Sequence, residues 1–297
     1  MSFKNIKKYV ITLCILMSFG ACNNVFAMPF GTLLPEYHHQ KFNKVNFVFV
    51  ARYFEQENIL RAEELLTLIL KYDPDNIKAM FYLGLLAESR NQTQEAAKLF
   101  EKILEIDPNN EKVLHYYGLI LDKMKKTDEG LQYMLKAYEL SQYDPHITYD
   151  IGIVYAKKNN YPEALKYFER TIELKPDMAE AYNNTCYTLA CLGEYQKALG
   201  YCQKSLELEP RSAATLDSIG YVYYGLNQYQ EAASYFEKAL SIDSNLGEVY
   251  LHYAKTLQKL GDYKKAKEYF INYLKLEPHA PDKKEVKALI KQKKPKS

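Results

Sequence analysis

Cysteines are the residues of this 297-residue chain whose spacing most directly suggests chemistry. Cys186, Cys191 and Cys202 lie close together, but no Cys-x-x-Cys pair occurs, which disfavours a zinc site or a thioredoxin-like redox centre. Three is also an odd number, so at least one thiol stays unpaired. We expect Cys186 and Cys202 to be buried free thiols. A disulfide within the same pair of helices is the alternative, and an oxidising compartment would permit it.

Other catalytic constellations are missing from the sequence. Neither Gly-x-x-x-x-Gly-Lys nor Gly-x-Ser-x-Gly occurs, which removes the usual phosphate loop and nucleophile elbow. The paired carboxylates of Glu63 and Glu64 suit a solvated helix surface, and His38 and His39 read as a solvated pair. We therefore predict no enzyme activity, no cofactor and no metal site.

A block of 34 residues recurs along the chain. This repeat determines where the candidate binding residues lie. Seven blocks span residues 43–280, and position 32 of a block is usually proline. The residues in that slot are Pro74, Pro108, Gln142, Pro176, Pro210, Ser244 and Pro278. A period of this length indicates a solenoid, in which each unit buries its apolar face only by stacking on its neighbours. We expect one elongated array over 43–280.

Two columns of small residues show that each block is a pair of closely packed helices. Position 8 is mostly glycine and position 20 mostly alanine, while position 24 carries large residues such as Phe100, Phe168 and Phe236. Small residues half a block apart allow two helix backbones to approach closely. The turn between the helices is predicted at positions 14–16, where Asn91 and Gly193 tolerate a helix-ending conformation.

These columns resemble the tetratricopeptide repeat, whose pattern is Gly at position 8, Ala at 20, an aromatic at 24 and Pro at 32. Blocks 77–110, 145–178 and 213–246 match it almost completely. The resemblance implies an all-α, right-handed superhelical solenoid of helix-turn-helix repeats that serves as a binding scaffold. Block 111–144 departs from the pattern, with Gly130 in place of alanine and Asp144-Pro145 displaced by three residues. A local kink is expected there.

The first 27 residues read as an export signal, because Lys4, Lys7 and Lys8 precede an apolar run that is too short to span a membrane. Two processing sites compete. Cleavage after Ala27 gives a soluble periplasmic or secreted chain, whereas a lipobox-like sequence ending at Cys22 gives a lipidated, membrane-attached one. An uncleaved anchor is a third reading. Residues 28–42 form a lead-in to the repeats under either cleavage.

Charge is unevenly distributed over the predicted mature chain. The part from 28 to 280 carries a net charge of −6, and segment 281–297 carries +5. An acidic array with a basic tail does not suit nucleic-acid binding. Val286, Leu289 and Ile290 have helical spacing, so 281–297 is predicted to be a basic capping helix and tail. Contact of its lysines with anionic lipid or an acidic partner is the alternative.

The first helices are expected to line a concave surface, because in the family the inner face is formed chiefly by positions 2, 5, 9 and 12. Positions 5 and 9 are apolar in the N-terminal half of this chain and polar or aromatic in the C-terminal half, while position 2 changes from basic to acidic residues. Apolar patches bordered by charge are typical of partner sites. The candidate contact residues are Phe47, Phe81, Leu85, His115, Leu119, Tyr149, Ile153, Asn183, Tyr187, Asp217, Tyr221, Tyr224 and Lys255. The alternative for any one of them is packing between neighbouring first helices.

Taken together, the sequence predicts a non-catalytic adaptor of a bacterial cell envelope that holds an extended peptide or amphipathic helix of a partner protein. It would be periplasmic or associated with the outer membrane, similar to envelope assembly lipoproteins, or secreted to act on host proteins. Membrane contact would need lipidation at Cys22 or the basic tail. A glycan-binding accessory of an envelope enzyme, with Tyr187, Tyr221 and Tyr224 as stacking platforms, is the alternative from a different class.

Overall fold

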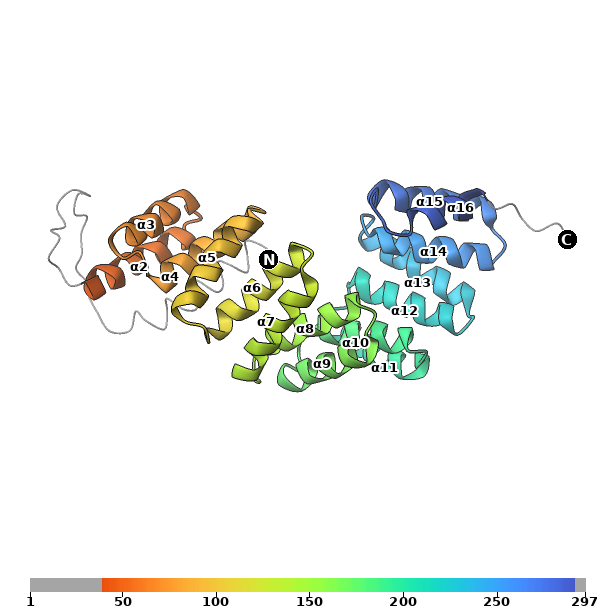
Figure 1. Cartoon of the computed structure of the whole chain (residues 1–297). Coiled ribbons are helices and arrows are strands. Elements are labelled where there is room, and N and C mark those ends of the chain that lie inside the picture. Colours follow the sequence, from red (N-terminus) through yellow and green to blue (C-terminus); the bar gives the residue numbers. More distant parts are fainter. Residues whose placement is uncertain (1–38, 292–297) are drawn as a thin grey trace. The chain divides into compact units, whose positions relative to one another are not determined.

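The structure is a computed structural model that describes residues 39–291, with side chains described from Asn46 onward. This range contains 15 helices and no strand, so the predicted all-α fold is confirmed (Figure 1). Two compact units divide between Gln142 and Tyr143. Unit 1 is described here over 39–142 and unit 2 over 143–291. The predicted signal peptide, Cys22, most of the lead-in and the end of the basic tail lie outside the described residues.

Each block contributes a first helix over its positions 1–13 and a second helix over positions 17–30. The exception is the opening helix, which is 17 residues long. The helices of unit 1 are α2 (His39–Glu55), α3 (Ile59–Tyr72), α4 (Ile77–Ser89), α5 (Thr93–Ile106), α6 (Glu111–Lys123) and α7 (Thr127–Leu140). The 34-residue period is therefore kept through the third block, although that block lacks its closing proline.

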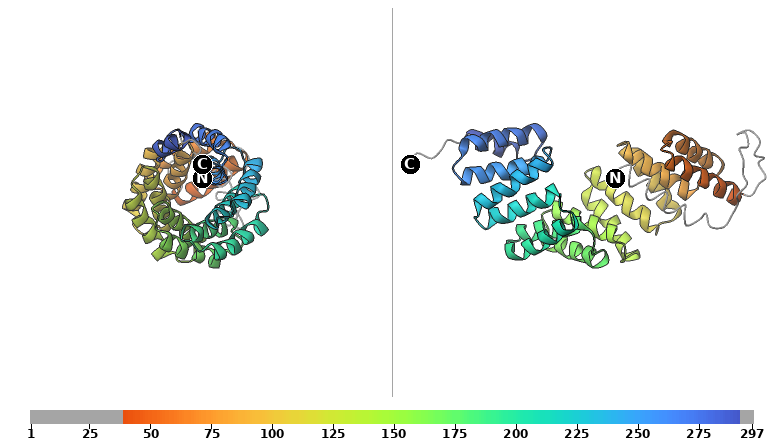
Figure 2. Two further views of the ribbon diagram at one scale, coloured as in Figure 1. Left: turned by 90° about the vertical axis from the view of Figure 1, so that its right-hand side faces the viewer. Right: turned by 180° about the vertical axis from the view of Figure 1, so that it is seen from behind.

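Unit 2 repeats the same arrangement four times and adds one final helix. Its helices are α8 (Pro145–Lys157), α9 (Tyr161–Leu174), α10 (Ala179–Cys191), α11 (Tyr195–Leu208), α12 (Ala213–Gly225), α13 (Tyr229–Ile242), α14 (Gly247–Lys259), α15 (Tyr263–Leu276) and α16 (Lys283–Lys291). Within this unit each second helix contacts the first helix that follows it, so successive pairs stack (Figure 2, green to blue).

Local sequence explains where the helices begin and end. The side chains of Asn76, Asn110 and Ser212 accept hydrogen bonds from backbone amides at the starts of α4, α6 and α12. The turn between the two helices of a block contains one residue with positive φ, always at position 15. These residues are Glu57, Asn91, Lys125, Asn159, Gly193, Asn227 and Gly261. The predicted turn is confirmed, and Glu57 and Lys125 were not foreseen because neither type favours that conformation.

The two helices of a block pack through the small and aromatic columns. In α8 a Cβ atom on Gly152 would lie 2.6 Å from the ring of Phe168, and in α12 one on Gly220 would lie 2.5 Å from the ring of Phe236. Both rings are fully buried. In these two blocks glycine at position 8 leaves room for the aromatic ring at position 24, which occupies the space that a side chain would need.

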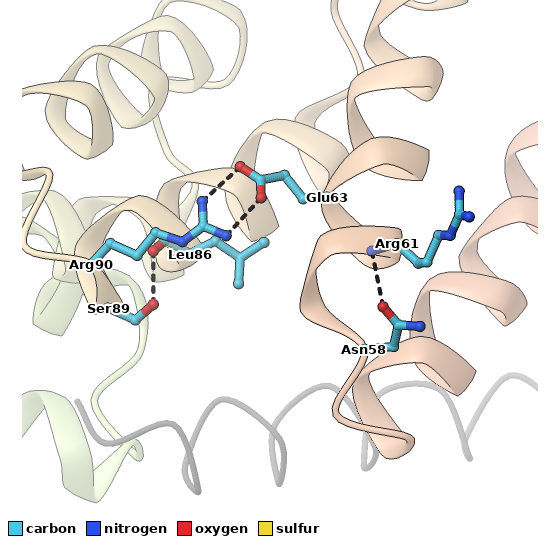
Figure 3. A network of polar contacts seen from close by, with 6 residues as sticks. All are labelled: Asn58, Arg61, Glu63, Leu86, Ser89 and Arg90. Carbon is cyan, nitrogen blue, oxygen red and sulfur yellow. Dashed lines mark hydrogen bonds and ion pairs between the residues drawn. The ribbon is translucent and has the colours of Figure 1, made fainter.

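Glu63 and Arg90 connect the first two blocks of unit 1 (Figure 3). The guanidinium of Arg90, which caps the C-terminus of α4, donates to both carboxylate oxygens of Glu63 on α3, at 2.7 and 2.8 Å. This hydrogen bonding lowers the pKa of Glu63 below its ordinary value. Both side chains are about one-third exposed, so the pair contributes little to stability.

The last block of unit 2 is covered by α16. Val286 is fully buried, and Leu289 and Ile290 pack against the same apolar cluster. The phenol of Tyr273 donates a 2.6 Å hydrogen bond to Asp282, which holds the start of α16 against α15. The apolar stripe noted in the sequence is thus the face that closes the end of the stack.

Asn46 is a polar residue at an apolar position of unit 1. It is 7% exposed, and none of the described residues accepts a hydrogen bond from its side-chain nitrogen. Position 4 is Met80 in α4 and Leu114 in α6, both buried. An unsatisfied buried amide costs about 1–3 kcal/mol, so Asn46→Leu is expected to raise the midpoint of thermal unfolding of unit 1.

Thermal unfolding followed by circular dichroism checks this, with Asn184→Leu as the matched control. Asn184 also lies on a first helix, but its amide has a partner in Tyr149. The control is expected to destabilise the protein. A lower unfolding midpoint for Asn46→Leu would contradict the assignment of Asn46 as an unsatisfied group.

Candidate binding surface

Successive first helices meet through one pair of positions. Position 5 of one first helix lies against position 6 of the next, and we call this set of pairs the cross-block ladder. In unit 1 both pairs are aromatic: Phe47 and Tyr82 have ring centroids 6.2 Å apart, and Phe81 and Tyr116 are 5.4 Å apart. The ammonium of Lys78 lies 4.5 Å from the centre of the Phe47 ring. The ladder of unit 1 is therefore an apolar seam.

In unit 2 the same positions are polar. The amide of Asn184 on α10 donates a 2.8 Å hydrogen bond to the hydroxyl of Tyr149 on α8. On the last pair, Nδ1 of His252 on α14 lies 3.0 and 3.1 Å from the two carboxylate oxygens of Asp217 on α12. Between these pairs lies Asn183, whose buried side-chain oxygen has no hydrogen-bond partner among the described residues.

The Asp217–His252 pair is nearly excluded from solvent, with side chains 11% and 12% exposed. Burial by itself would lower the pKa of His252, but the charge of Asp217 and its hydrogen bond outweigh burial and raise that pKa above the ordinary value. Glu248 on α14 acts in the same direction and Lys255 opposes it. The pair is thus a buried ion pair that joins α12 to α14.

This raised pKa predicts a pH-dependent stability. Because the pKa of His252 is higher in the folded chain than in the unfolded one, its contribution is complete below about pH 6.5. The contribution is lost as pH rises through the folded value. We expect the free energy of unfolding of the wild type to fall relative to that of His252→Gln between pH 6 and pH 9, by about 1.4 kcal/mol for each unit of raised pKa.

Thermal unfolding at a series of pH values measures this difference. His146→Gln, which alters an exposed histidine of the same unit, serves as the control and should leave the pH profile of the wild type unchanged. A difference between wild type and His252→Gln that stays constant over the range would show that His252 does not gain a proton on folding.

A cluster of tyrosines borders the polar ladder of unit 2. The rings of Tyr187 and Tyr221 are 5.2 Å apart, and Tyr221 lies 5.0 Å from the ring of His252. Burial raises the pKa of Tyr187, and it raises that of Tyr221 to about 12. Burial also raises the pKa of Tyr149 to about 12. These phenols therefore stay protonated near neutral pH and can donate hydrogen bonds.

Cys191 lies within this cluster as the free thiol of the described residues. Burial raises its pKa, although the hydroxyls of Tyr161, Tyr187 and Tyr221 interact with the thiol and act in the opposite direction. A cysteine nucleophile needs a lowered pKa and a neighbouring base. Cys191 has the reverse environment, which gives no support to a catalytic role.

Cys191 lies at position 13 of its block, where a tyrosine from the preceding block limits the size of the side chain. Tyr161, at position 17 of the preceding block, interacts with Cys191 at position 13, and in the next block the ring of Tyr195 fills the space in front of Gly225. A Cβ atom on Gly225 would collide with the Tyr195 ring. In these two pairs of neighbouring blocks, the tyrosine at position 17 therefore lies against a small residue at position 13 of the next block.

Cys186 and Cys202 form a disulfide, so the expectation of buried free thiols was wrong for this pair. Both are fully buried, as expected. They occupy positions 8 and 24, which face each other across α10 and α11, and their Cα atoms are 5.3 Å apart. That separation lies within the range that a disulfide spans, so the close helix packing that the small residues permit also brings the sulfurs together.

The predicted contact residues differ in how accessible they are. Phe47, Leu85, His115 and Asp217 are buried within their units. The others are partly exposed: Phe81, Leu119, Tyr149, Ile153, Asn183, Tyr187, Tyr221, Tyr224 and Lys255. Only this second group is available to touch a partner without rearrangement. It is concentrated in unit 2.

The sequence interpretation missed the partners at position 6. Tyr82, Tyr116, Asn184 and His252 were not candidates, yet each contacts the position 5 residue of the preceding block. A signal was present, because the two columns match in character: aromatic faces aromatic in unit 1 and polar faces polar in unit 2. Comparing adjacent columns across blocks would have found it.

Other kinds of site find no support in residues 39–291. No group of three or more His, Cys, Asp and Glu side chains could hold a metal ion within the described part of the chain. A shallow depression of about 280 Å³ lies beside the turn after α10, lined by residues such as Tyr195 and Leu226, and is small for a ligand pocket. None of the described helices has the length and apolar character needed to cross a bilayer.

Comparison with known families gives one consistent result. Five family models, all described as tetratricopeptide repeat, match residues 50–111, 99–132, 148–178, 177–245 and 223–292. A search of curated protein sequences found no match.

Solved structures agree on the fold. A tetratricopeptide repeat protein from Parabacteroides merdae superposes with a TM-score of 0.66 at 17% identity, covering 85% of this chain and 97% of that one. PilW, described as a widely conserved type IV pilus biogenesis factor, gives 0.61 at 20% identity, with 71% and 97% covered. Pseudomonas aeruginosa PilF gives 0.57 at 19% identity, with 73% and 98% covered.

Family models and solved structures thus agree with the helix pairs, the small columns and the aromatic position 24 seen in both units. Members of this family are typically non-catalytic scaffolds for protein–protein interaction. The chain belongs to the tetratricopeptide repeat family.

Proposed function

We propose that this protein is a non-catalytic scaffold of a bacterial cell envelope, and that it binds an extended segment of a partner protein along the first helices of unit 2. The proposed contact residues are Tyr149, Ile153, Asn183, Tyr187, Tyr221, Tyr224 and Lys255, with Phe81 and Leu119 as a separate apolar contact in unit 1. Asp217 is buried and is not a proposed contact, because its carboxylate pairs with His252.

The unsatisfied side-chain oxygen of Asn183 is the observation that supports this proposal most directly. Its side-chain oxygen is buried and lacks a hydrogen-bond partner among the described residues, while the Tyr149–Asn184 and Asp217–His252 pairs on either side of it are hydrogen-bonded. An unsatisfied acceptor costs free energy that a bound donor would recover. Tyr187 follows Asn183 by four residues on α10, so both lie on one face of the helix. Because the oxygen is buried while the residue is partly exposed, a rotation of the Asn183 side chain would bring this oxygen to a backbone N–H of an extended peptide.

Three other observations support the proposed location in the cell envelope. The disulfide between Cys186 and Cys202 suits an oxidising compartment such as the periplasm. The N-terminal residues have the order of an export signal, with lysines before a short apolar run. PilW, to which the chain is similar in fold, is described as a pilus biogenesis factor. Periplasmic, membrane-attached and secreted forms would all meet the disulfide requirement.

Asn183→Leu tests the binding surface. It removes the acceptor while keeping a similar volume, so we expect the unfolding midpoint to stay level or rise. We also expect the affinity for the partner to fall at least about tenfold, the equivalent of one hydrogen bond of about 1.4 kcal/mol. Partners are first captured by the wild type from detergent-solubilised cell envelope, and the purified partner is then titrated by calorimetry.

Gln230→Leu is the matched control, because Gln230 is an exposed residue of unit 2 on α13, outside the proposed surface. It should leave the affinity unchanged. A partner that binds Asn183→Leu and a Tyr187→Ala variant as tightly as the wild type would remove the first helices of unit 2 as the binding surface. If no envelope protein is captured, a host protein or a glycan becomes the ligand to test.

A further inference from the structure

The last described helix, α16, has the register of a first helix. When the 34-residue count continues beyond Ala280, Val286 takes position 6, the position that a first helix contributes to the cross-block ladder. Val286 and Leu251, which is at position 5 of α14, pack in one apolar cluster. Among the described residues α16 contacts α15, and no second helix follows it (Figure 1). It is therefore a first helix without the second helix that completes each of the seven blocks.

Lysines occupy the face of α16 that a second helix would cover. Positions 4, 7 and 11 of α16 are Lys284, Lys287 and Lys291, and all three are exposed. Their spacing of three and four residues places them on one side of the helix, opposite the buried Val286. We call these three residues the lysine face. In α6 the residues at the same positions are all buried: Leu114, Tyr117 and Leu121.

The lysine face belongs to a basic end of an otherwise acidic array. Residues 247–291 contain ten lysines and six carboxylates, whereas residues 43–246 contain 22 basic and 30 acidic residues. None of the ten lysines forms an ion pair with a carboxylate among the described residues. In earlier blocks such pairs are common, as between Lys126 and Glu129. The positive charge of this end is therefore not neutralised by neighbouring carboxylates.

A bilayer that contains anionic lipid fits the lysine face better than a protein does. Protein interfaces are centred on apolar or aromatic side chains and are poor in lysine. The lysine face has no such anchor, because the residue between its lysines on that side is Ala288. An anionic bilayer needs no anchor, since it attracts clustered lysines by charge alone. It also repels the carboxylates of the other blocks, which leaves the basic end as the part that approaches it.

We propose that the lysine face of α16 binds the anionic headgroups of a lipid bilayer. The contact is peripheral, because the apolar side of α16 is already packed against the last block through Val286 and does not insert. The contact is also electrostatic, so it weakens as the salt concentration rises. It depends neither on the proposed partner binding by the first helices of unit 2 nor on lipidation at Cys22.

Sedimentation with vesicles tests the contact. The chain without residues 1–27 keeps every described residue, and it is mixed with vesicles of phosphatidylcholine or of phosphatidylcholine with phosphatidylglycerol. We expect binding to the anionic vesicles, reduced at high salt. A Lys284→Gln, Lys287→Gln, Lys291→Gln variant is expected to partition about 100-fold less, because each lysine near an anionic bilayer contributes about fivefold. Arginine at the same three positions should preserve the binding.

The matched control is Lys166→Gln, Lys197→Gln, Lys204→Gln, which removes three exposed lysines of α9 and α11 and changes the net charge equally. It should leave partitioning unchanged. An equal loss in the control would overturn the proposal, because net charge alone would then explain binding. Equal partitioning of the wild type onto both kinds of vesicle would also overturn it. So would binding to poly-L-glutamate without binding to anionic vesicles, in favour of an acidic protein segment.

Discussion

Replacing Gly130 by valine is expected to destabilise unit 1 by about 3 kcal/mol or more. Gly118 on α6 and Gly130 on α7 face each other so closely that a Cβ atom on Gly118 would lie 2.6 Å from the carbonyl oxygen of Gly130. A Cβ atom on Gly130 would collide with the carbonyl oxygen of Gly118 in turn. The obstacle is backbone, which cannot rotate away as a side chain can. The two helices would have to separate.

Gly200→Val is the matched control, because a Cβ atom on Gly200 in α11 meets nothing within 4 Å. Urea denaturation followed by circular dichroism gives the free energy of unfolding for both variants. Hydrogen exchange of α6 and α7 shows whether the loss is confined to the third block. Equal stability of the two variants would mean that α6 and α7 are less tightly packed than the structure shows.

Removing the Cys186–Cys202 disulfide is expected to cost unit 2 about 3 kcal/mol, the contribution of a crosslink that closes a loop of about 16 residues. The bond joins α10 to α11 in the middle of the unit, and both sulfurs are buried. The double variant Cys186→Ala, Cys202→Ala removes it. Alanine also leaves space at position 24, so part of the loss in this variant comes from packing.

Reductant separates the covalent contribution from the packing contribution. Treating the wild type with dithiothreitol should lower its free energy of unfolding by about 3 kcal/mol, whereas the double variant should not respond. Cys191→Ala is the control, since Cys191 is a free thiol, and it should respond to dithiothreitol as the wild type does. A wild type insensitive to reductant under unfolding conditions would show that no disulfide is present.

Gly130 shows how a departure from the repeat pattern can have a structural meaning. The sequence presents it as an irregular residue in a column of alanines. In the structure it lies opposite Gly118, where an alanine would touch backbone. In the second, fourth and sixth blocks an aromatic ring at position 24, such as Phe168, separates the backbones of the two helices. The third block has the thinner, flexible Met134 there, which lets the two glycines approach.

The sequence by itself determined the features that depend on periodicity and local conformation. Three features were sufficient to predict the family and the helix pairs over 43–280. They are the 34-residue period, the positions of small and aromatic residues, and the turns near position 15. The reason is that each block repeats one local solution, so several copies report the same position. Capping side chains such as Asn76 act within one turn of helix and leave the same kind of local signal.

Only the tertiary structure decided which residues meet across blocks. Whether Asp217 reaches His252, or Cys186 reaches Cys202, depends on how far one helix is rotated and displaced against the next. The same rotation buries Leu85 while leaving Tyr187 partly exposed, although both occupy position 9. The matching columns at positions 5 and 6 indicate which residues could be neighbours, but the distances between them are set by the packing of many side chains at once.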